Sequence, residues 1–463
     1  MYDLIIIGAG TAGISAYNKA IKHTQNILII NDGPWDTTCA RVGCMPSKLL
    51  ISSANRMHDI QSANNLALQY DTVVDTSGVM QGMHILRERF IRATLKGVDQ
   101  WETSHKVSGH AKFIDAHTVE VNGQSYQAKS FIVAVGSRPN IDETLKQKLK
   151  DKFITSNEIF EFSQLPKSLA VIGSGIIAIE LAQAMQRLGV QTTMFARSQK
   201  LGALTSPILQ KLAQEQFSKE LNIKFKTLPD EIEIQADKIK INFTENDQTK
   251  SIEVEYVLGA TGRQSNIDRL GLDQLNSIFK DIKNLPIDKK TKQLANLPIF
   301  IVGDAAPDAP IQHEAAHAGK QVVHNCVNYP NVKPITALTP LAIVFCHPEM
   351  AIVGKSFKQL EDQQVNFIRG FVSYENQGRA LVLAENTGGV EVYIDKNSGK
   401  LLGAELFCSQ AEHLAHLLAW MIDADQDIHQ ILKKPFYHPT LEEGLRTAFK
   451  HARRQFDALQ EKS

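Results

Sequence analysis

The strongest constraint on the fold is a strand–turn–helix–strand pattern that occurs twice in the 463-residue chain. The first copy reads YDLIIIGAGTAGISAYNKAIKHTQNILIIN and has its glycine turn at Gly8, Gly10 and Gly13. The second reads SLAVIGSGIIAIELAQAMQRLGVQTTMFAR, and its turn positions are Gly173, Gly175 and Ala178. The spacing is the same in both copies, since the second strand ends equally far from the first glycine, at Asn31 and at Ala196.

A glycine turn between a strand and a helix is typical of a dinucleotide-binding βαβ unit. The first glycine permits the tight turn, the second lets a pyrophosphate approach the backbone, and the third lets the helix pack on the sheet. The N-terminus of the helix then faces the phosphates. One such unit with an unrelated glycine-rich helix is the alternative, but the matched spacing disfavours it. Two units predict two dinucleotide cofactors, or one cofactor and a dinucleotide substrate.

The residues at the two strand ends differ, and they predict different nucleotides. An acid there binds ribose hydroxyls, whereas an arginine accommodates a 2′-phosphate. The first copy has Asn31 followed by Asp32, and the second has Ala196 followed by Arg197 and, soon after, Lys200. The second site therefore favours NADP(H), with a solvated basic loop as the alternative interpretation.

Composition narrows the class of protein and its location. Lysine plus arginine and aspartate plus glutamate both number 50, so neither a nucleic-acid nor a membrane partner is expected. Five cysteines, an odd number, do not suit the disulfide framework of a secreted protein. The N-terminus has no basic region before its glycines, so no signal peptide is expected. We expect a cytoplasmic protein.

The segment DTTCARVGCMPSKLL places Cys39 and Cys44 five positions apart. A zinc site would need a second ligand pair, but Cys326, Cys346 and Cys408 are scattered, so no metal is expected. A static disulfide across so few residues would constrain little chain. We therefore interpret the two cysteines as a pair that cycles between dithiol and disulfide.

The same segment is expected to be helical. Thr37 or Thr38 can cap a helix that begins near Cys39. Pro46 is expected to distort this helix just beyond Cys44.

In this order along the chain, the segments GAGTAG, TTCARVGCMPSK, GSGIIAIE, VGD and HPTLEE resemble the class I pyridine nucleotide–disulfide oxidoreductases. This family includes dihydrolipoamide dehydrogenase, glutathione reductase and mercuric reductase, and the cysteine segment is most similar to the first. The resemblance implies an α/β fold with two Rossmann-like dinucleotide-binding domains and a C-terminal α+β interface domain. The implied boundaries are 1–150 and 266–335 for the two parts of the FAD-binding domain, 151–265 for the NAD(P)-binding domain, and 336–463 for the interface (dimerisation) domain.

The resemblance implies FAD and NAD(P)(H) as cofactors and a separate role for each cysteine. Cys44 matches the cysteine whose thiolate lies against the flavin, and Cys39 matches the one that exchanges with the substrate. Lys48 matches a lysine that approaches the flavin and pairs with a glutamate of the nicotinamide domain, at Glu180. A solvated helix lysine is the alternative for Lys48.

A further candidate lies in PFYHPTLEEGLRTAFKHA, where His438 precedes Pro439 and two glutamates. Pro439 is expected at the first helical position. In the family this histidine shuttles the thiol proton, Glu443 orients it, and the histidine acts on the cysteines of the partner subunit, so a homodimer is implied. The alternative is a helix start at which Glu442 and Glu443 only complement the dipole.

Further cofactor positions surround the two glycine turns. Gly303 and Asp304 end an apolar strand, and the resemblance assigns Asp304 to a ribityl hydroxyl of the flavin nucleotide. Segments 131–140 and 257–266 are expected to cross between the two nucleotide-binding domains. The remaining predicted cofactor-binding positions are Ala111, Val135, Gly136, Ser137, Gln312, His313 and Gly262.

The expected substrate is a dihydrolipoyl-type dithiol, either free or as the lipoyl group of a 2-oxo acid dehydrogenase complex. Electrons would pass between this dithiol, the Cys39–Cys44 pair, flavin and NAD(P)(H). Arg197 and the missing acid at Ala196 favour an alternative, an NADPH-dependent reductase of another small disulfide, similar to glutathione reductase. Phe436 also departs from the H-x-H-P-T pattern usual in dihydrolipoamide dehydrogenases. A non-enzymatic flavoprotein is a third interpretation, which no sequence feature favours.

Overall fold

The computed structural model describes residues 1–306 and 311–461. Two compact units make up the chain, and each contains several separate segments. The first unit comprises Met1–Pro46, Met83–Asn140 and Arg263–Leu338, and the second comprises Ser47–Gly82, Ile141–Gly262 and Thr339–Ser463.

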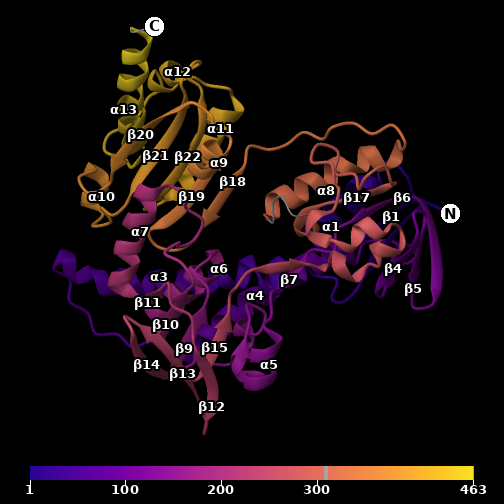
Figure 1. The fold of residues 1–463 in the computed structure, drawn as a ribbon, viewed down its shortest axis with the longest axis horizontal. Coiled ribbons are helices and arrows are strands. Elements are labelled where there is room, and N and C mark those ends of the chain that lie inside the picture. The colour runs from indigo at the N-terminus through magenta and orange to yellow at the C-terminus, as the bar shows by residue number, and fades with distance from the viewer. Residues whose placement is uncertain (307–310, 462–463) are drawn as a thin grey trace. The chain divides into compact units, whose positions relative to one another are not determined.

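The first unit is built on a parallel sheet (Figure 1). Its strands follow the order β3 (Lys106–Ser108), β2 (Ile27–Asn31), β1 (Tyr2–Ile7), β6 (Gln124–Val133) and β17 (Ile299–Ile301). The long strand β6 also pairs antiparallel with β5 (Thr118–Val121), which pairs with β4 (Ala111–Asp115). Placing β1 in the middle, with the later strands β2 and β6 on either side of it, is the arrangement of a doubly wound α/β domain.

Both faces of this sheet are buried, which explains why its strands read as continuous apolar runs. Leu4 and Ile6 of β1 belong to one core cluster, and the alternating Ile5 and Ile7 belong to another. Helices α1 (Thr11–Ala20) and α8 (Gln312–Val327) pack against one another over the first cluster. The hairpin β4–β5 covers the second.

The second unit repeats the βαβ pattern. Its parallel sheet has the order β11 (Asn222–Phe225), β10 (Gln191–Ala196), β9 (Ser168–Ile172), β15 (Tyr256–Gly259) and β8 (Phe153–Ile154). Helices α6 (Ile176–Arg187) and α7 (Pro207–Glu220) follow β9 and β10, and an antiparallel sheet is formed by β12 (Glu231–Gln235), β13 (Lys238–Glu245) and β14 (Gln248–Val254). The two predicted strand–turn–helix–strand repeats are therefore confirmed.

The C-terminal part of the second unit is an antiparallel sheet with helices (Figure 1). The strand order is β18 (Leu341–Val344), β19 (Glu349–Gly354), β22 (Leu401–Cys408), β21 (Gly389–Asp395) and β20 (Phe367–Ser373). Helices α11 (Ala411–Asp423) and α13 (Glu442–Gln460) bury apolar faces against this sheet. The predicted fold class, two Rossmann-like domains and a C-terminal α+β domain, is confirmed. The remaining helices with four or more turns are α3 (Cys44–Ser62) and α4 (Thr76–Val98), and the shorter ones are α2 (Thr38–Val42), α5 (Glu143–Leu149), α9 (Phe357–Asp362), α10 (Gly378–Val382) and α12 (Ile428–Leu432).

The chain leaves the first unit after Asn140 and returns to it at Arg263. These two points fall within the segments expected to cross between domains. The segments also pair with each other, because β7 (Ser137–Pro139) lies antiparallel to β16 (Arg263–Ser265).

Two local predictions about helices were wrong. The cysteine segment forms two helices that are separated at Gly43, before Cys44, and Pro46 lies in the first turn of the second helix without distorting it. In a first turn the missing N–H of proline breaks no hydrogen bond, so Pro46 is tolerated there. Pro439 does not begin a helix either, since α13 begins at Glu442.

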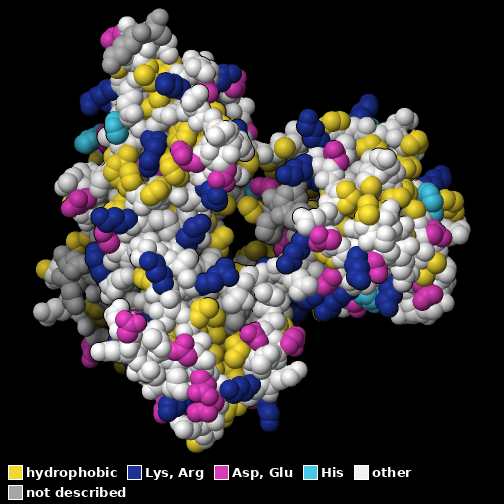
Figure 2. Space-filling view, viewed as in Figure 1, with side chains coloured by type: hydrophobic (Ala, Val, Ile, Leu, Met, Phe, Trp, Pro, Cys, Tyr) yellow, Lys and Arg dark blue, Asp and Glu magenta, His cyan; other side chains and the backbone are white. Residues whose placement is uncertain are grey.

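No helix among residues 1–306 and 311–461 is long and apolar enough to cross a bilayer. On the face shown in Figure 2, lysine and arginine side chains are interspersed with aspartate and glutamate. This mixture matches the zero formal net charge of the whole chain.

The third glycine of the first turn predicts a measurable stability difference. A Cβ added to Gly13 would lie 1.8 Å from the carbonyl oxygen of Gly8, whereas one added to Gly10 would meet no heavy atom within 4 Å. We expect Gly13→Ala to lower the free energy of unfolding by about 1–3 kcal/mol, the usual cost of overpacking. Gly10→Ala, which keeps a permitted φ of −75°, is the matched control and should cost less than about 1 kcal/mol.

Urea unfolding followed by tryptophan fluorescence checks this expectation, since Trp35 and Trp101 both belong to the first unit. Equal unfolding midpoints for the two variants would contradict it.

Candidate active site

The first glycine turn leaves the N-terminus of α1 open. Gly8 has a φ of +103°, and a Cβ there would lie 2.4 Å from the carbonyl oxygen of Ala134. Gly10 is the N-cap residue of α1, and no side chain accepts a hydrogen bond from the first amides of that helix. Free amides and an open space beside Gly10 suit a pyrophosphate.

Asn31, predicted as a nucleotide-binding residue, holds the turn itself. Its Oδ1 accepts a hydrogen bond from the N–H of Ala9 at 2.9 Å, and its Nδ2 donates to the carbonyls of Gly33 and Pro34 at 3.1 and 2.8 Å. The residue is buried. Turning its amide toward a ligand would leave the Ala9 N–H without its partner, at a cost of about 1–3 kcal/mol.

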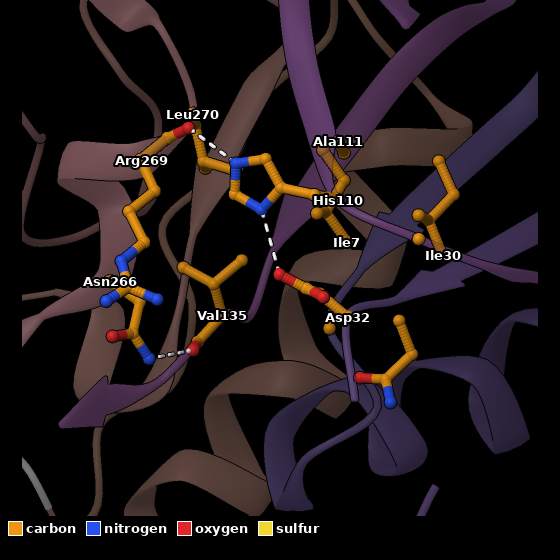
Figure 3. Close-up of a pocket in the computed structure, with 12 residues that line it drawn as sticks. Ile7, Ile30, Asp32, His110, Ala111, Val135, Asn266, Arg269 and Leu270 are labelled. Atoms are coloured by element: carbon orange, nitrogen blue, oxygen red, sulfur yellow. Dashed lines mark hydrogen bonds and ion pairs between the residues drawn. The ribbon is translucent and has the colours of Figure 1, made fainter. Parts of the chain in front are cut away.

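Asp32 instead lies in a pocket at the ends of β1 and β2 (Figure 3). Its Oδ2 contacts Nδ1 of His110 at 2.9 Å, and Nε2 of the same ring contacts the carbonyl oxygen of Arg269 at 2.9 Å. Both contacts are with acceptors, so they are made together when both ring nitrogens carry a proton. The predicted residues Ala111 and Val135 also line this pocket.

Two predicted residues of the same unit, Ser137 and Asp304, meet near β7 and β17. Ser137 donates a hydrogen bond from its hydroxyl to Asp304 at 3.0 Å. Arg263, which the sequence did not indicate, donates from Nε to the Ser137 hydroxyl at 2.8 Å and from a terminal nitrogen to the Ser137 carbonyl at 2.7 Å. Burial lowers the pKa of Arg263, and the negative charges of Asp304 and Cys44 oppose this shift.

The four other predicted positions of the first unit are two glycines with positive φ and two exposed residues of α8. Gly136 and Gly303 have φ values of +66° and +64°, a conformation that favours glycine. Gln312 and His313 are exposed in the first turn of α8.

The second glycine turn resembles the first. Gly173 has a φ of +133°, a Cβ there would lie 2.3 Å from the carbonyl oxygen of Ala260, and the position beside Gly175 is open. Ala178 is fully buried in α6. Gly262 has a φ of +113° and open space beside it.

At the end of β10, Ala196 is buried, and the two cations that follow it, Arg197 and Lys200, are both exposed. They are accessible to an anionic ligand.

The five cysteines have two kinds of environment. Cys39 in α2 is half-buried and Cys44 at the start of α3 is exposed. Cys326, Cys346 and Cys408 are buried, and burial raises the pKa of each thiol, which makes them poor nucleophiles. No group of three or more His, Cys, Asp or Glu side chains that could hold a metal occurs among the residues that the structure describes.

Gly43 folds the chain back between Cys39 and Cys44. A Cβ at Gly43 would lie 2.9 Å from the carbonyl oxygen of Thr38 and 3.0 Å from the Cα of Cys39. The backbone directly before Cys44 therefore lies against Cys39. Thr37 accepts a hydrogen bond from the N–H of Ala40 and caps α2, as predicted for Thr37 or Thr38.

In the second unit, Lys48 and Glu180 form an ion pair. Nζ of Lys48 donates to Oε2 of Glu180 at 2.8 Å, and Oε1 of Glu180 accepts the N–H of Phe345 at 2.8 Å. Glu180 is only 5% exposed at its side chain, and Lys48 also lies over the Phe345 ring, 4.7 Å from its centroid. A carboxylate buried to this degree needs both donors.

The His438 side chain contacts Glu443. Its Nδ1 lies 3.1 Å from Oε2 and 3.3 Å from Oε1 of this carboxylate, and the N–H of Thr440 donates to Oε2 at 3.2 Å. The imidazole is 80% exposed in the single chain. With Nδ1 against Glu443, Nε2 is the ring nitrogen that can accept a proton from a ligand.

The sequence analysis missed His110, Arg263 and Phe345. His110 precedes a predicted residue and Arg263 follows one, but their partners lie 78 and 126 positions away. Only the folded sheet brings such distant positions together.

Comparisons with known proteins identify the family. Residues 2–324 match the family described as pyridine nucleotide-disulphide oxidoreductase, and residues 341–449 match the dimerisation domain of that family. A dihydrolipoyl dehydrogenase of Geobacillus stearothermophilus is 28% identical over 95% of this chain and 94% of its own length. A mercuric reductase of Lysinibacillus sphaericus is 27% identical over 96% of this chain and 82% of its own length.

Solved structures share the fold. LpdA from Mycobacterium tuberculosis superposes with a TM-score of 0.80 at 19% identity, over 98% of this chain and 99% of that one. The HOCl-induced flavoprotein disulfide reductase RclA from Escherichia coli does so with a TM-score of 0.78 at 18% identity, over 97% and 99%. The chain therefore belongs to the pyridine nucleotide–disulphide oxidoreductases, enzymes that use FAD and NAD(P)(H).

Proposed function

We propose that the protein oxidises a dihydrolipoyl-type dithiol through a Cys39–Cys44 disulfide, in the manner of a dihydrolipoyl dehydrogenase. The observation that carries the proposal is the placement of two accessible cysteines on either side of the Gly43 turn, with the other three cysteines buried. The similarity to the Geobacillus stearothermophilus dihydrolipoyl dehydrogenase supports the choice of substrate.

The exchange consists of two displacements. A substrate thiolate attacks Sγ of Cys39, which breaks the Cys39–Cys44 bond and releases Cys44 as a thiolate. The second substrate thiolate then attacks the substrate sulfur of the mixed disulfide, which closes the cyclic disulfide and releases Cys39. The substrate loses two electrons, and the cysteine pair gains them.

His438 is the proposed base for this exchange. Its Nε2 takes the proton from the substrate thiol, and the Glu443 carboxylate at Nδ1 stabilises the imidazolium that results. Family members of this kind act as homodimers, and the match to the dimerisation domain supports the same state here. We assign His438 to the cysteine pair of the partner subunit.

The chain's own residues fit FAD in the first glycine turn and the pocket beside it. Bound FAD supplies the two-electron carrier between the reduced cysteine pair and the pyridine nucleotide. We propose that the amides of the α1 N-terminus hold its pyrophosphate, Asp32 its adenosine ribose and Asp304 its ribityl chain. The Lys48 cation, kept in place by Glu180, would balance the negative charge that develops at the reduced cofactor.

A second candidate is an NADPH-dependent reductase of another small disulfide. The exposed cations Arg197 and Lys200 after β10, together with Ala196 in place of an acid, favour it. The same cysteine chemistry would then run in the opposite direction.

The first prediction from the proposed function concerns the dithiol substrate. We expect the FAD-loaded protein to reduce NAD⁺ or NADP⁺ with dihydrolipoamide under anaerobic conditions. Cys39→Ser and Cys44→Ser should each abolish this reaction, whereas Cys326→Ser, a buried control, should retain it. Absence of turnover with dihydrolipoamide and lipoamide, with either nucleotide, would refute the lipoyl substrate.

The second prediction concerns the nicotinamide nucleotide. We expect kcat/KM for NADPH to exceed that for NADH, and Ala196→Glu to shift the ratio toward NADH by about tenfold, since an acid there binds the ribose and repels the 2′-phosphate. Gln199→Glu, at an exposed position of the loop that follows β10, serves as the control for added charge. A parent protein that prefers NADH tenfold or more would count against the second candidate.

The third prediction concerns FAD affinity. We expect Asp32→Asn to weaken FAD binding by about tenfold or more, as measured by titration of flavin fluorescence, because a charged hydrogen bond to the ribose is lost. Asp247→Asn, in the exposed turn between β13 and β14, is the control.

Asn31→Asp offers the opposite test. It adds an acid, but it removes the donor that holds Gly33 and Pro34, so we expect no gain in affinity. Tighter FAD binding by this variant would show that position 31, and not Asp32, reaches the ribose.

A further inference from the structure

The loop that carries His438 is held by its own residues and by side chains from another segment of the chain. Residues 433–441 lie between α12 and α13 and belong to neither helix. Tyr437, directly before the histidine, is 81% exposed, so it does not anchor the loop in the core of the chain. Phe436 and Leu441, in contrast, pack in the C-terminal core, and the Thr440 hydroxyl donates to the carbonyl oxygen of Tyr437 at 2.8 Å.

Two side chains from the segment after β20 hold the end of this loop. The hydroxyl of Tyr374 donates to the carbonyl oxygen of Leu441 at 2.8 Å, and Nε2 of Gln377 donates to the carbonyl oxygen of Thr440 at 2.7 Å. These carbonyls belong to consecutive peptide groups, so the backbone from Thr440 to Glu442 is held at two successive points. Tyr374 is fully buried in the C-terminal core.

The first turn of α13 rests directly on the same tyrosine. A Cβ on Gly444 would lie 2.4 Å from the Tyr374 hydroxyl and 2.6 Å from its Cζ. Glu443, the residue before this glycine, carries the carboxylate that contacts His438. The position of this carboxylate is thus set by the contact between Gly444 and Tyr374.

Thr440 connects Gln377 with the Glu443–His438 pair. Its carbonyl is held by Gln377, and its N–H donates to Oε2 of Glu443, the oxygen that lies 3.1 Å from Nδ1 of His438. A shift of Thr440 would therefore move the acid relative to the imidazole. Burial raises the pKa of Tyr374 well above its usual value, so its hydroxyl remains a donor wherever the enzyme works.

We propose that Tyr374 and Gln377 are positioning residues for His438, which act by holding the Thr440–Leu441 backbone so that Glu443 meets the imidazole. The inference rests on the proposed role of His438 as the base in dithiol exchange. It adds two residues that touch neither substrate nor cofactor and that no part of the proposed reaction itself requires.

Core packing is the competing explanation for Tyr374, and a matched pair of variants separates the two. Tyr374→Phe keeps the ring and removes the hydroxyl. Tyr393→Phe does the same to another fully buried tyrosine, in strand β21, whose hydroxyl contacts Glu391 at 3.3 Å and not the His438 loop. Both variants should lower thermal stability, and only Tyr374→Phe should change the exchange reaction.

The test measures kcat and KM for dithiol oxidation across pH in the FAD-loaded full chain. We expect Tyr374→Phe to lower kcat by about tenfold, the size of one lost hydrogen bond, with KM for the nicotinamide nucleotide unchanged. The acidic limb of its pH–rate profile should move in the same direction as that of Glu443→Gln. Gln377→Met should move it in that direction as well.

A double-mutant cycle supplies the decisive comparison. If Tyr374 acts through Glu443, adding Tyr374→Phe to Glu443→Gln should cost less than about twofold more, because residues that act as a unit are not additive. Independent, multiplicative losses would overturn the proposal, as would a Tyr374→Phe profile that coincides with that of Tyr393→Phe.

His438→Gln separates this inference from the proposed function. Full activity of His438→Gln would remove the proposed base, and the positioning role would fall with it. A large loss in His438→Gln together with an unchanged profile in Tyr374→Phe would overturn the positioning role alone.

Discussion

The close approach of a helix to a glycine turn is the constraint on which the nucleotide-binding part of the first unit depends. Residue 13 packs so closely that a single added methyl group would overlap the carbonyl of Gly8. Because of this approach, the first amides of α1 end at an open space with no side chain to cap them. Asn31 then ties the turn to the end of β2 through the N–H of Ala9. The proposed pyrophosphate site therefore rests on backbone geometry and not on any charged side chain.

Two glutamates of the second unit are stabilised in the same way. Glu180 and Glu443 each have one titratable partner, Lys48 or His438, and each also accepts a backbone N–H. The backbone donor keeps the carboxylate in place whatever the partner does. Lys48 and His438 are both proposed to meet changing charge during turnover. In this arrangement the backbone N–H orients the carboxylate, while Lys48 or His438 interacts with its charge.

Local sequence rules were least successful at the two prolines near the proposed catalytic groups. Pro46 was expected to disturb a helix, but the chain breaks at Gly43, where the backbone packs against Cys39, and Pro46 falls in a first turn that tolerates it. Pro439 was expected to start a helix, but the helix begins at Glu442, where Gly444 can pack against Tyr374. The Gly43 contact is local, with residues about one helical turn away, whereas the Gly444 contact is tertiary, with Tyr374. Helix propensity includes neither contact.

The sequence by itself determined the two βαβ repeats, the class of fold, the family and the pair of cysteines that differs from the rest. These features are encoded locally, in apolar periodicity and in glycines whose spacing follows from strand and helix geometry. Only the tertiary structure decided that Asn31 serves the turn while Asp32 faces the pocket with His110, and that Tyr374 supports the loop of His438. These contacts join residues far apart in the chain. The packing of the core decides which atoms come within hydrogen-bond distance of such a side chain, and the local sequence does not.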